Sequence, residues 1–375
     1  MDNNYYSNQE DIYSYSRGKH SKHSAGKNKK HKSKKNNSSK FKRRRAVVIV
    51  SLVLAIVICA GVGVRMYMDS ILNTANRDTD FNSDNVQANS EVFKGKDYTN
   101  IALFGVDARE NTFKGCRSDS VIVLTIDKKH NKIKMTSLAR DSYVKMDGHG
   151  KDKLTHAYAY GGAELAVKTI NQNYNLDIQD YVTVNFFGFA EIINYLGGVT
   201  LDVDASEMDV MNTHYISYIN SYGIKCDYIK KTGVQLLNGG QALAYTRNRY
   251  SPGGDIERGN RQKEVLTLVF EKVKKLGITK LPELAKIGLK NCQTSLTNSE
   301  IIDIGTWALM NSPTVENKSL PDEDCHPKSG SGAMINGVWY YIYDLDVATQ
   351  KLHDFINEEG TYVDPNASSS VSTAE

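Results

Sequence analysis

"SDSVIVLTIDKKHNKIKMTSLARD", residues 118–141, contains two apolar runs on either side of the polar turn DKKHN. Runs rich in β-branched residues between polar clusters are typical of strands, so this stretch predicts two consecutive strands joined by a short turn. Charged residues lie where the predicted strands begin and end, at Arg117, Asp119, Arg140 and Asp141. The ends of strands are the usual place for binding sites in α/β folds. The stretch therefore predicts both a sheet and a charged site near its edge.

The neighbouring segments alternate between strand and helix patterns. An apolar run predicts a buried strand at 98–107, and apolar spacing predicts a helix at 162–174. The segments YVTVNF, FGFAEIINYLGG and VTLDV, within 181–203, predict a strand, a helix closed by glycines and another strand. After residue 278 a helix opening at Thr297 and a later strand and helix are expected. This alternation predicts an α/β layered fold whose sheet is mixed, because it contains a hairpin.

The beginning of the chain differs in composition from the rest. Residues 1–45 carry 14 Lys/Arg and three acidic residues, whereas the remainder carries 33 Lys/Arg and 40 Asp/Glu. Residues 46–64 are uncharged and mostly apolar, and a helix of that length spans roughly 28 Å, close to a hydrocarbon core. The basic run FKRRR before it keeps the head in the cytoplasm and sends the rest outside. We predict a retained anchor rather than a cleaved signal peptide, because no A-x-A-like site follows before Arg65.

The lysine-rich head has two interpretations, a nucleic-acid-binding arm or a disordered tail that faces lipid headgroups. No aromatic residue lies between positions 17 and 40 to stack on bases, which favours the tail and no nucleic-acid partner. The predicted parts of the chain are a basic cytoplasmic tail (1–45), a transmembrane helix (46–66), a stalk (67–96), an α/β domain (97–278), a C-terminal extension packed on or completing that domain (279–362) and a disordered end (363–375).

A second stretch, AYTRNRYSPGGDIERGNRQ (244–262), holds four arginines and only two acidic residues. Uncompensated charge that points inward is costly, so these arginines require a partner. On a helix that turns about 100° per residue, Arg258 and Gln262 continue an apolar stripe that includes Val265, with an N-cap predicted at Asp255. The helix N-terminus adds positive potential at the same place. We predict that the missing anion is a phosphate or pyrophosphate of a ligand.

Asp107 and Asp119, which follow and precede predicted strands, have two interpretations. Carboxylates beside arginines commonly form salt bridges. Alternatively they hold Mg²⁺, with Mn²⁺ as the second choice, because hard cations take carboxylate oxygens together with substrate phosphates. Such an ion and the arginines would together neutralise charge on a transferring phosphoryl group. The sequence has no G-x-x-x-x-G-K-[ST] motif, which excludes a P-loop nucleotidase.

A histidine, an aromatic segment and the cysteines are further candidates for chemistry or binding. His156 is either a general base or, more commonly for a single histidine near an apolar helix, a hydrogen-bonded structural residue. The segment NFFGFAEIINYL (185–196) either lines a slot for a lipid or packs in the core. The absence of a C-x-x-C pair argues against zinc. The cysteines beyond the predicted span form disulfides or stay free, and they are Cys116, Cys226, Cys292 and Cys325.

Six ordered blocks between about 97 and 278 resemble the LytR-CpsA-Psr family. They are NIALFGVDAR, RSDSVIVLTID, LARDSYV, KLTHAYAYGG, LNGGQALAYTRNRY and GDIERGNRQ. The resemblance implies an α-β-α sandwich with an apolar tunnel for a polyprenyl tail. It also implies an anchored extracellular enzyme of the Gram-positive type. Such enzymes move a glycopolymer, of the teichoic acid or capsule kind, from a polyprenyl-pyrophosphate carrier to peptidoglycan and form a phosphodiester bond.

Carried over by position, the resemblance implies roles for individual residues. Asp107 and Asp119 would bind Mg²⁺. The pyrophosphate and its sugar would be surrounded by Arg109, Arg117, Arg140, Arg247, Arg249, Arg258 and Gln262. Asp119 or Asp141 is the first candidate for the general base. The lipid tail would contact Phe186, Phe187, Phe189, Ile192 and Ile193.

Two features depart from the family pattern. LARD replaces the more usual proline-containing PRD but keeps Arg140 and Asp141. The tyrosine-rich segment 207–230 matches no block of the family. Two other functions stay open at this point. One is hydrolysis of the lipid pyrophosphate, with water in place of the wall hydroxyl. The other is a non-catalytic, membrane-tethered regulator of envelope genes.

Overall fold

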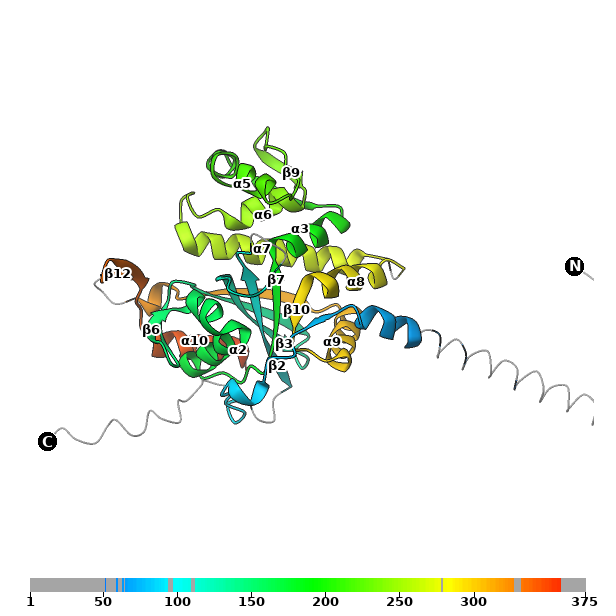
Figure 1. The fold of residues 1–375 in the computed structure, drawn as a ribbon, viewed down its shortest axis with the longest axis horizontal. Coiled ribbons are helices and arrows are strands. Elements are labelled where there is room, and N and C mark those ends of the chain that lie inside the picture. Colours follow the sequence, from blue (N-terminus) through cyan, green and yellow to red (C-terminus); the bar gives the residue numbers. More distant parts are fainter. Residues whose placement is uncertain are drawn as a thin grey trace, which may run out of the picture. The chain divides into compact units, whose positions relative to one another are not determined.

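The structure, a computed structural model, describes residues 51, 59, 63, 65–93, 97–108, 112–277, 279–326 and 332–358 (Figure 1). The chain divides into two units, 1–63 and 64–375, and the regular elements described below belong to the second. The predicted tail 1–45, most of the predicted span 46–66 and the end 363–375 lie outside the described residues. Among the residues that are described, no helix combines the length and apolar character needed to cross a membrane.

A mixed sheet forms the centre of the second unit. Its strands, in spatial order, are β1 (Asn76–Arg77), β10 (Cys292–Thr294), β7 (Asp180–Asn185), β2 (Tyr98–Val106), β3 (Ser118–Asp127), β4 (Lys132–Leu138) and β11 (Thr314–Leu320). The predicted hairpin is confirmed: β3 and β4 are antiparallel, with Ile122 opposite Ser137. β7 runs parallel to β2, and β11 runs parallel to β4. The prediction of a mixed α/β sheet is therefore confirmed.

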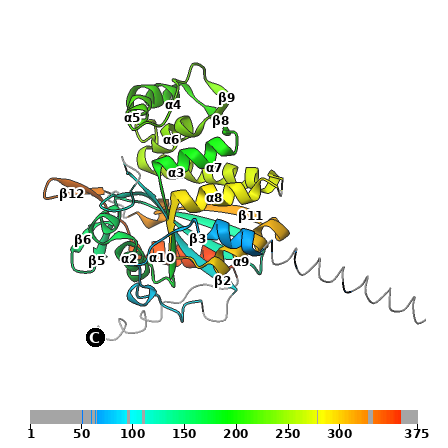
Figure 2. The same cartoon turned by 45° about the vertical axis from the view of Figure 1, so that its right-hand side comes forward.

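Alternating side chains of β2 divide the core between the two faces of this sheet. Ala102 and Phe104 pack in one cluster with helices α2 (Leu154–Tyr174) and α10 (Leu345–Ile356). Ile101 and Leu103 point the other way and pack toward helix α9 (Asn298–Asn311). Helix α7 (Gly254–Lys275) contacts β4 and β11, and the views in Figures 1 and 2 place it with α3 (Phe186–Tyr195) and α8 (Leu281–Asn291) on one side of the sheet.

A second core lies among the elements between residues 186 and 269. It contains side chains of β8 (Val199–Val203), α4 (Ala205–Val210), the π-helical turn η2 (Met211–Tyr215), α5 (Ile216–Ser221), β9 (Gly233–Leu237) and α6 (Gly239–Arg247). β8 forms at the predicted residues, but it pairs with β9 in a separate two-stranded sheet. Its alternating buried and exposed residues explain why it needs cover on one face only.

Some boundaries differ from the sequence-based expectations. α2 begins at Leu154, before the predicted start, and is kinked at Gly161 and Gly162. Gly162 has φ of 61°, a value that favours glycine, which accounts for the interruption. The predicted capping box at Thr297 and Glu300 is present at the start of α9.

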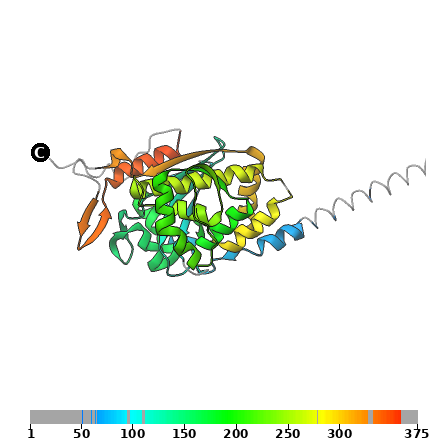
Figure 3. The ribbon, with the colours of Figure 1, turned by 90° about the horizontal axis from the view of Figure 1, so that it is seen from above.

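The part of the chain after residue 278 contributes two strands, β10 and β11, to the central sheet. It also contributes the hairpin β12 (Gly332–Ile335) and β13 (Val338–Tyr341). A second hairpin, β5 (Tyr143–Met146) and β6 (Gly150–Lys153), leads into α2. Figures 1 and 3 show the β12–β13 hairpin standing out from the body of the unit, beside the β5–β6 region.

Candidate active site

A cavity of about 720 Å³ lies between the central sheet and the helices of the second core. One part of its wall is charged and the rest is mostly apolar. The charged and polar residues are Asp107, Arg117, Asp119, Arg140, Arg247, Arg249, Arg258 and Gln262. The structure thus brings side chains from the two quoted stretches, which lie far apart in the sequence, to one cavity.

Strand pairing brings the two candidate metal-binding carboxylates to the same end of the β2–β3 pair. Asp107 follows β2, and its backbone N–H donates to the carbonyl of Arg117, 3.1 Å away. The backbone N–H of Arg117 in turn donates to Asp107 Oδ1, at 2.8 Å. Asp119 lies two residues further along, in β3, and both carboxylates line the cavity. The β2–β3 register therefore positions the pair.

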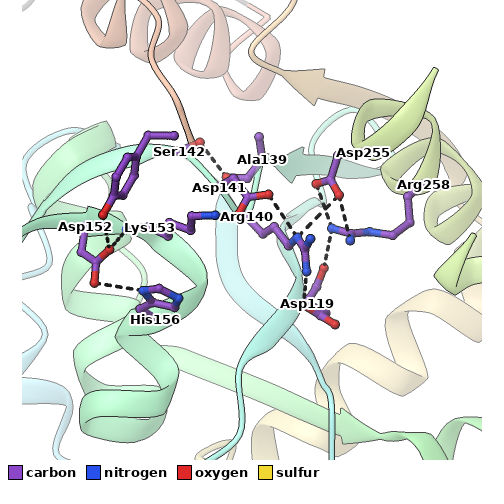
Figure 4. A network of polar contacts seen from close by, with 11 residues as sticks. Asp119, Ala139, Arg140, Asp141, Ser142, Asp152, Lys153, His156, Asp255 and Arg258 are labelled. Carbon is purple, nitrogen blue, oxygen red and sulfur yellow. Dashed lines mark hydrogen bonds and ion pairs between the residues drawn. The ribbon is translucent and has the colours of Figure 1, made fainter. Parts of the chain in front are cut away.

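Asp119 is held by Arg140, whose Nη1 lies 2.5 Å from Asp119 Oδ1 (Figure 4). Burial acts to raise the pKa of Asp119, but the charges of Arg140 and Arg258 and the hydrogen bond from Arg140 outweigh it and lower that pKa below its usual value. The Arg140 Nε also lies 3.4 Å from Asp141 and 3.5 Å from Asp255. Asp119 is consequently ionised at neutral pH.

Arg258 is buried and projects from the first turns of α7. Its Nη1 pairs with Asp255 Oδ1 at 2.8 Å, and its Nη2 donates to the carbonyl of Asp119 at 3.1 Å. Burial and the like charge of Arg140 lower the pKa of Arg258. Its Nε has no hydrogen-bond partner among the described residues.

The predicted N-cap at Asp255 is wrong, because the helix already begins at Gly254. The cap residue is Gly253, with φ of 87°, so the chain turns through a conformation that favours glycine. Asp255 lies within the first turn, where its carboxylate reaches Arg258 three residues later.

Arg247 and Arg249, at the end of α6, have aromatic rather than acidic neighbours. The Arg247 guanidinium lies 4.4 Å from the Phe186 ring centre and 5.4 Å from that of Tyr215. Arg249 lies over Tyr250, at 5.1 Å from the ring centre. Within the described part of the chain, neither arginine forms an ion pair, and Arg247 Nη1 is buried without a hydrogen-bond partner.

Arg261 has its anionic partner within the protein. Its Nε donates to Glu207 Oε1 at 2.7 Å, and its Nη1 donates to the carbonyl of Asn248 at 3.0 Å. Both members of this pair are buried. Within 244–262, Arg258 and Arg261 therefore have acidic partners in the chain, whereas Arg247 and Arg249 form no ion pair with a described residue.

The apolar wall of the cavity comes from α3, the sheet and the segment around η2. Four of the five predicted lipid-contacting residues line it: Phe186, Phe189, Ile192 and Ile193. Phe187 does not line the cavity; it packs against the second core, because it points away from the neighbouring Phe186 on the helix.

The remaining predicted site residues occupy different positions. Gln262 lines the cavity and its amide nitrogen lies 3.4 Å from the carbonyl of Thr246. Asp141 is not among the residues that line the cavity, and its Oδ1 lies 2.8 Å from Lys153 Nζ. Arg109 lies outside the described residues.

Several residues that complete the cavity wall were not predicted from the sequence to belong to the site. They are His214, Tyr215, Tyr218, Tyr222, Leu243, Tyr250 and Cys292. Four of these side chains come from segment 207–230, whose high tyrosine content was the one sequence feature that could have indicated a binding surface. Periodicity did not reveal it, since a π-helical turn interrupts the helical spacing.

His156 and the cysteines take structural positions. His156 Nδ1 lies 2.9 Å from Asp152 Oδ2, away from the arginine cluster (Figure 4). Every cysteine that the structure describes is a free thiol. Cys292, which lines the cavity, is half-buried, and desolvation of its thiol raises its pKa to about 12.

The LytR_cpsA_psr family model matches residues 64–355. The chain belongs to the LytR_cpsA_psr family. A family relative in Bacillus subtilis (strain 168), named polyisoprenyl-teichoic acid–peptidoglycan teichoic acid transferase TagT, is 30% identical over 308 residues, covering 80% of this chain and 90% of the relative. The enzyme named TagU in Oceanobacillus iheyensis is 32% identical over 309 residues, covering 78% and 87%.

Solved structures of LytR_cpsA_psr proteins share the fold. One described as TagT bound to LI-WTA has a TM-score of 0.54 at 30% identity and covers 70% of this chain and 92% of that chain. Another, described as YwtF (TagT) with bound octaprenyl pyrophosphate lipid, has a TM-score of 0.50 at 29% identity and covers 70% and 91%. The family resemblance drawn from the six sequence blocks is confirmed.

Proposed function

We propose that this chain is a transferase that moves a glycopolymer from a polyprenyl-pyrophosphate carrier to peptidoglycan. The observation that carries the proposal is the composition of the 720 Å³ cavity, in which an arginine-rich end continues into an apolar wall. A polyprenyl pyrophosphate has the same two parts, an anionic head and a hydrocarbon tail. The names of the relatives, as teichoic acid transferases, support a cell-wall glycopolymer as the cargo.

The arginines at the charged end of the cavity have different roles. Arg140 and Arg258 are anchored by Asp119 and Asp255, which holds their guanidinium groups at the cavity wall. Arg247 keeps a buried donor that no described residue accepts, so it can turn that donor to a phosphate oxygen. Preorganised cations of this kind favour the extra negative charge that develops during phosphoryl transfer.

The bonds exchanged in the proposed reaction balance. The oxygen of a wall-sugar hydroxyl forms a bond to the glycan-side phosphorus, and the bond from that phosphorus to the bridging oxygen breaks. Polyprenyl phosphate leaves with the bridging oxygen, and the hydroxyl proton passes to a base. Asp119 is a poor base, because the neighbouring arginines lower the pKa of its carboxyl group. Asp141, the other first candidate, is held between Arg140 and Lys153.

Asp107 and Asp119 fit a Mg²⁺ ion by their chemistry. Both are carboxylates at adjoining strand ends, both line the cavity, and the lowered pKa of Asp119 keeps it ionised. Mg²⁺ commonly uses one or two carboxylates together with substrate phosphates. When bound, the ion would neutralise charge on the pyrophosphate oxygens. Mn²⁺, which also takes oxygen ligands, is the second choice.

The proposed setting is the outer face of the cell membrane, with residues 46–66 as the anchor and the basic head in the cytoplasm. The apolar run of residues 46–64 and the basic residues before it support this arrangement. An anchored enzyme stays in the plane that holds a lipid-linked donor, which raises its effective concentration.

The test uses the full-length chain in detergent, a polyprenyl-pyrophosphate-linked saccharide, peptidoglycan fragments and Mg²⁺, with products followed by mass spectrometry. A glycan–phosphate–peptidoglycan adduct that disappears with chelator and in Asp119→Ala and Arg258→Ala supports the proposal. Gln172→Ala, on the exposed side of α2, is the matched control and should behave as wild type. Release of polyprenyl phosphate without adduct, in the presence of acceptor, would instead identify a hydrolase. Donor binding with no turnover would contradict enzymatic function.

A further inference from the structure

The geometry points to an acceptor-binding surface outside the cavity, built from aromatic side chains, which we propose binds the glycan strand of peptidoglycan. The inference rests on the proposed function and names where its second substrate docks. The surface, called here the aromatic shelf, consists of Tyr143, His149, Tyr160 and Tyr340. These residues come from the β5–β6 hairpin, helix α2 and the β12–β13 hairpin.

The shelf exposes large rings that already contact one another. Tyr160 is 51% exposed and its ring stacks on His149, with centres 4.5 Å apart. The rings of Tyr340 and Tyr143, both half-buried, lie 4.8 Å apart. Aromatic side chains gathered at a surface in this way indicate a binding site more often than isolated exposed apolar residues do.

One carboxylate fixes the orientation of the rings. Asp152 accepts hydrogen bonds from the hydroxyls of Tyr160, at 2.9 Å, and Tyr340, at 3.3 Å, and pairs with His156 at 2.9 Å. Asp152 thus ties the two hairpins and α2 together. The rings are held before any ligand binds, which lowers the entropy cost of binding.

A saccharide fits this combination of groups. A sugar ring has an apolar C–H face that packs against an aromatic ring, and hydroxyl groups at its edge that hydrogen-bond to phenols, carboxylates and imidazoles. The shelf offers rings whose edges carry such polar groups, whereas aliphatic and phenylalanine side chains outnumber the tyrosines in the apolar wall of the cavity. The two surfaces therefore suit different ligands, a glycan on the shelf and a hydrocarbon tail in the cavity.

The shelf is continuous with the charged end of the active site. The backbone N–H of Tyr341, directly after Tyr340, donates to the carbonyl of Asp141 at 2.9 Å. Lys153 Nζ pairs with Asp141 at 2.8 Å and lies 5.8 Å from the centre of the Tyr340 ring. Figure 4 shows Lys153 and Asp141 between the Asp152–His156 pair and Arg140.

This continuity gives the two substrates separate approaches. The donor occupies the cavity, and no shelf residue lines that cavity. An acceptor strand laid along the shelf reaches the phosphate by way of Asp141 and Arg140. Docking of the acceptor on the shelf thus requires no displacement of the donor.

The experiment measures acceptor and donor binding separately on the full-length chain in detergent. The acceptor probe is a tetrasaccharide of alternating N-acetylglucosamine and N-acetylmuramic acid, followed by calorimetry, and the donor probe is octaprenyl pyrophosphate. We expect Tyr340→Ala and Tyr160→Ala each to weaken tetrasaccharide binding by roughly tenfold, because each removes one stacking ring. Donor binding should stay unchanged in both. Tyr160→Phe, which keeps the ring, should retain most of the acceptor affinity.

Met334→Ala is the matched control, because Met334 is 64% exposed in the same hairpin and pairs with Trp339, so its side chain lies on the face opposite Tyr340. Circular dichroism checks that each variant is folded. Unchanged tetrasaccharide binding in both ring-removing variants overturns the shelf, even when the wild type transfers glycan. Ring-dependent binding in a wild type that transfers nothing supports the shelf as a glycan site and contradicts the proposed transfer instead.

Discussion

The guanidinium of Arg247 lies 4.4 Å from the centre of the Phe186 ring, at the point where the charged end of the cavity meets its apolar wall. Tyr215 contacts the same guanidinium from a different helical segment. Aromatic faces attract a cation but leave its hydrogen-bond donors free. Aromatic contacts therefore hold Arg247 in place, and it forms no ion pair with a described carboxylate. This arrangement is expected of a residue that binds an anionic ligand.

Removing this guanidinium should impair transfer more than stability. We expect Arg247→Ala to lower the rate of adduct formation by roughly 10²-fold, the effect of deleting one preorganised donor. Arg247→Lys should restore little, because an ammonium group lacks the planar fork of arginine. The midpoint of thermal unfolding should change little, since no described ion pair is lost. A large drop in that midpoint together with near-normal transfer would contradict the assignment.

The apolar wall should make donor binding depend on the length of the lipid tail. Ile192 lines the cavity, whereas Phe187, on the same helix, packs against the second core. Ile192→Trp adds volume inside the cavity, so we expect it to weaken octaprenyl pyrophosphate binding by about tenfold, or ~1.4 kcal/mol, and to affect short-chain analogues less. Phe187→Trp is the control. Equal losses for long and short tails would indicate a general distortion.

Arg261 should behave as a structural residue. Its buried pair with Glu207 joins α7 to α4, and removing one partner leaves an uncompensated buried charge. We expect Glu207→Gln to lower the free energy of unfolding by about 3 kcal/mol, measured by urea denaturation. Donor affinity of the fraction that remains folded should be normal. If Arg261 instead bound the substrate directly, the Glu207→Gln variant would have normal stability and weakened donor binding.

Asp127 should contribute to acid sensitivity. Burial acts to raise its pKa, but hydrogen bonds from the His130 backbone and from Lys134 outweigh it and hold that pKa below its ordinary value. The folded chain then binds fewer protons at this site than the unfolded chain. The stabilisation is therefore fully present above about pH 4 and is lost as the pH falls through the lowered pKa.

The measurement compares urea unfolding of the wild type and Asp127→Asn at pH 7 and at pH 3. The variant leaves the fully buried Lys134 without this carboxylate, although Glu358 still lies 3.0 Å away. It should be less stable than the wild type at pH 7, and the difference should shrink at pH 3. A difference that stays constant with pH would show that Asp127 does not contribute through its charge.

Local patterns sufficed for much of the sheet. The apolar runs on either side of DKKHN became β3 and β4, because a short polar turn between β-branched runs leaves few alternatives to a hairpin. Thr297 and Glu300 form the predicted capping box, since that contact depends only on neighbouring residues. The charged residues at the ends of these strands, Arg117, Asp119 and Arg140, are also evident from the sequence.

Contacts between residues far apart in the sequence could not be predicted from local patterns. VTLDV forms a strand as predicted, yet it pairs with β9 rather than with the central sheet, and nothing local to it specifies the partner. Nothing in the sequence around Lys134 indicates that helix α10 covers it and accepts its hydrogen bond through the carbonyl of Ile356. The partners of such residues are distant in sequence and become visible only in the fold.

The amino-acid sequence by itself determined the mixed α/β character, the family and the surplus of arginine in 244–262, because these depend on composition, period and ordered motifs. The tertiary structure decided how that surplus is used. It paired Arg258 and Arg261 with Asp255 and Glu207, and it placed Arg247 between aromatic rings. The physical reason is that a cation's partner is set by distances across the fold, which the order of residues along one segment does not contain.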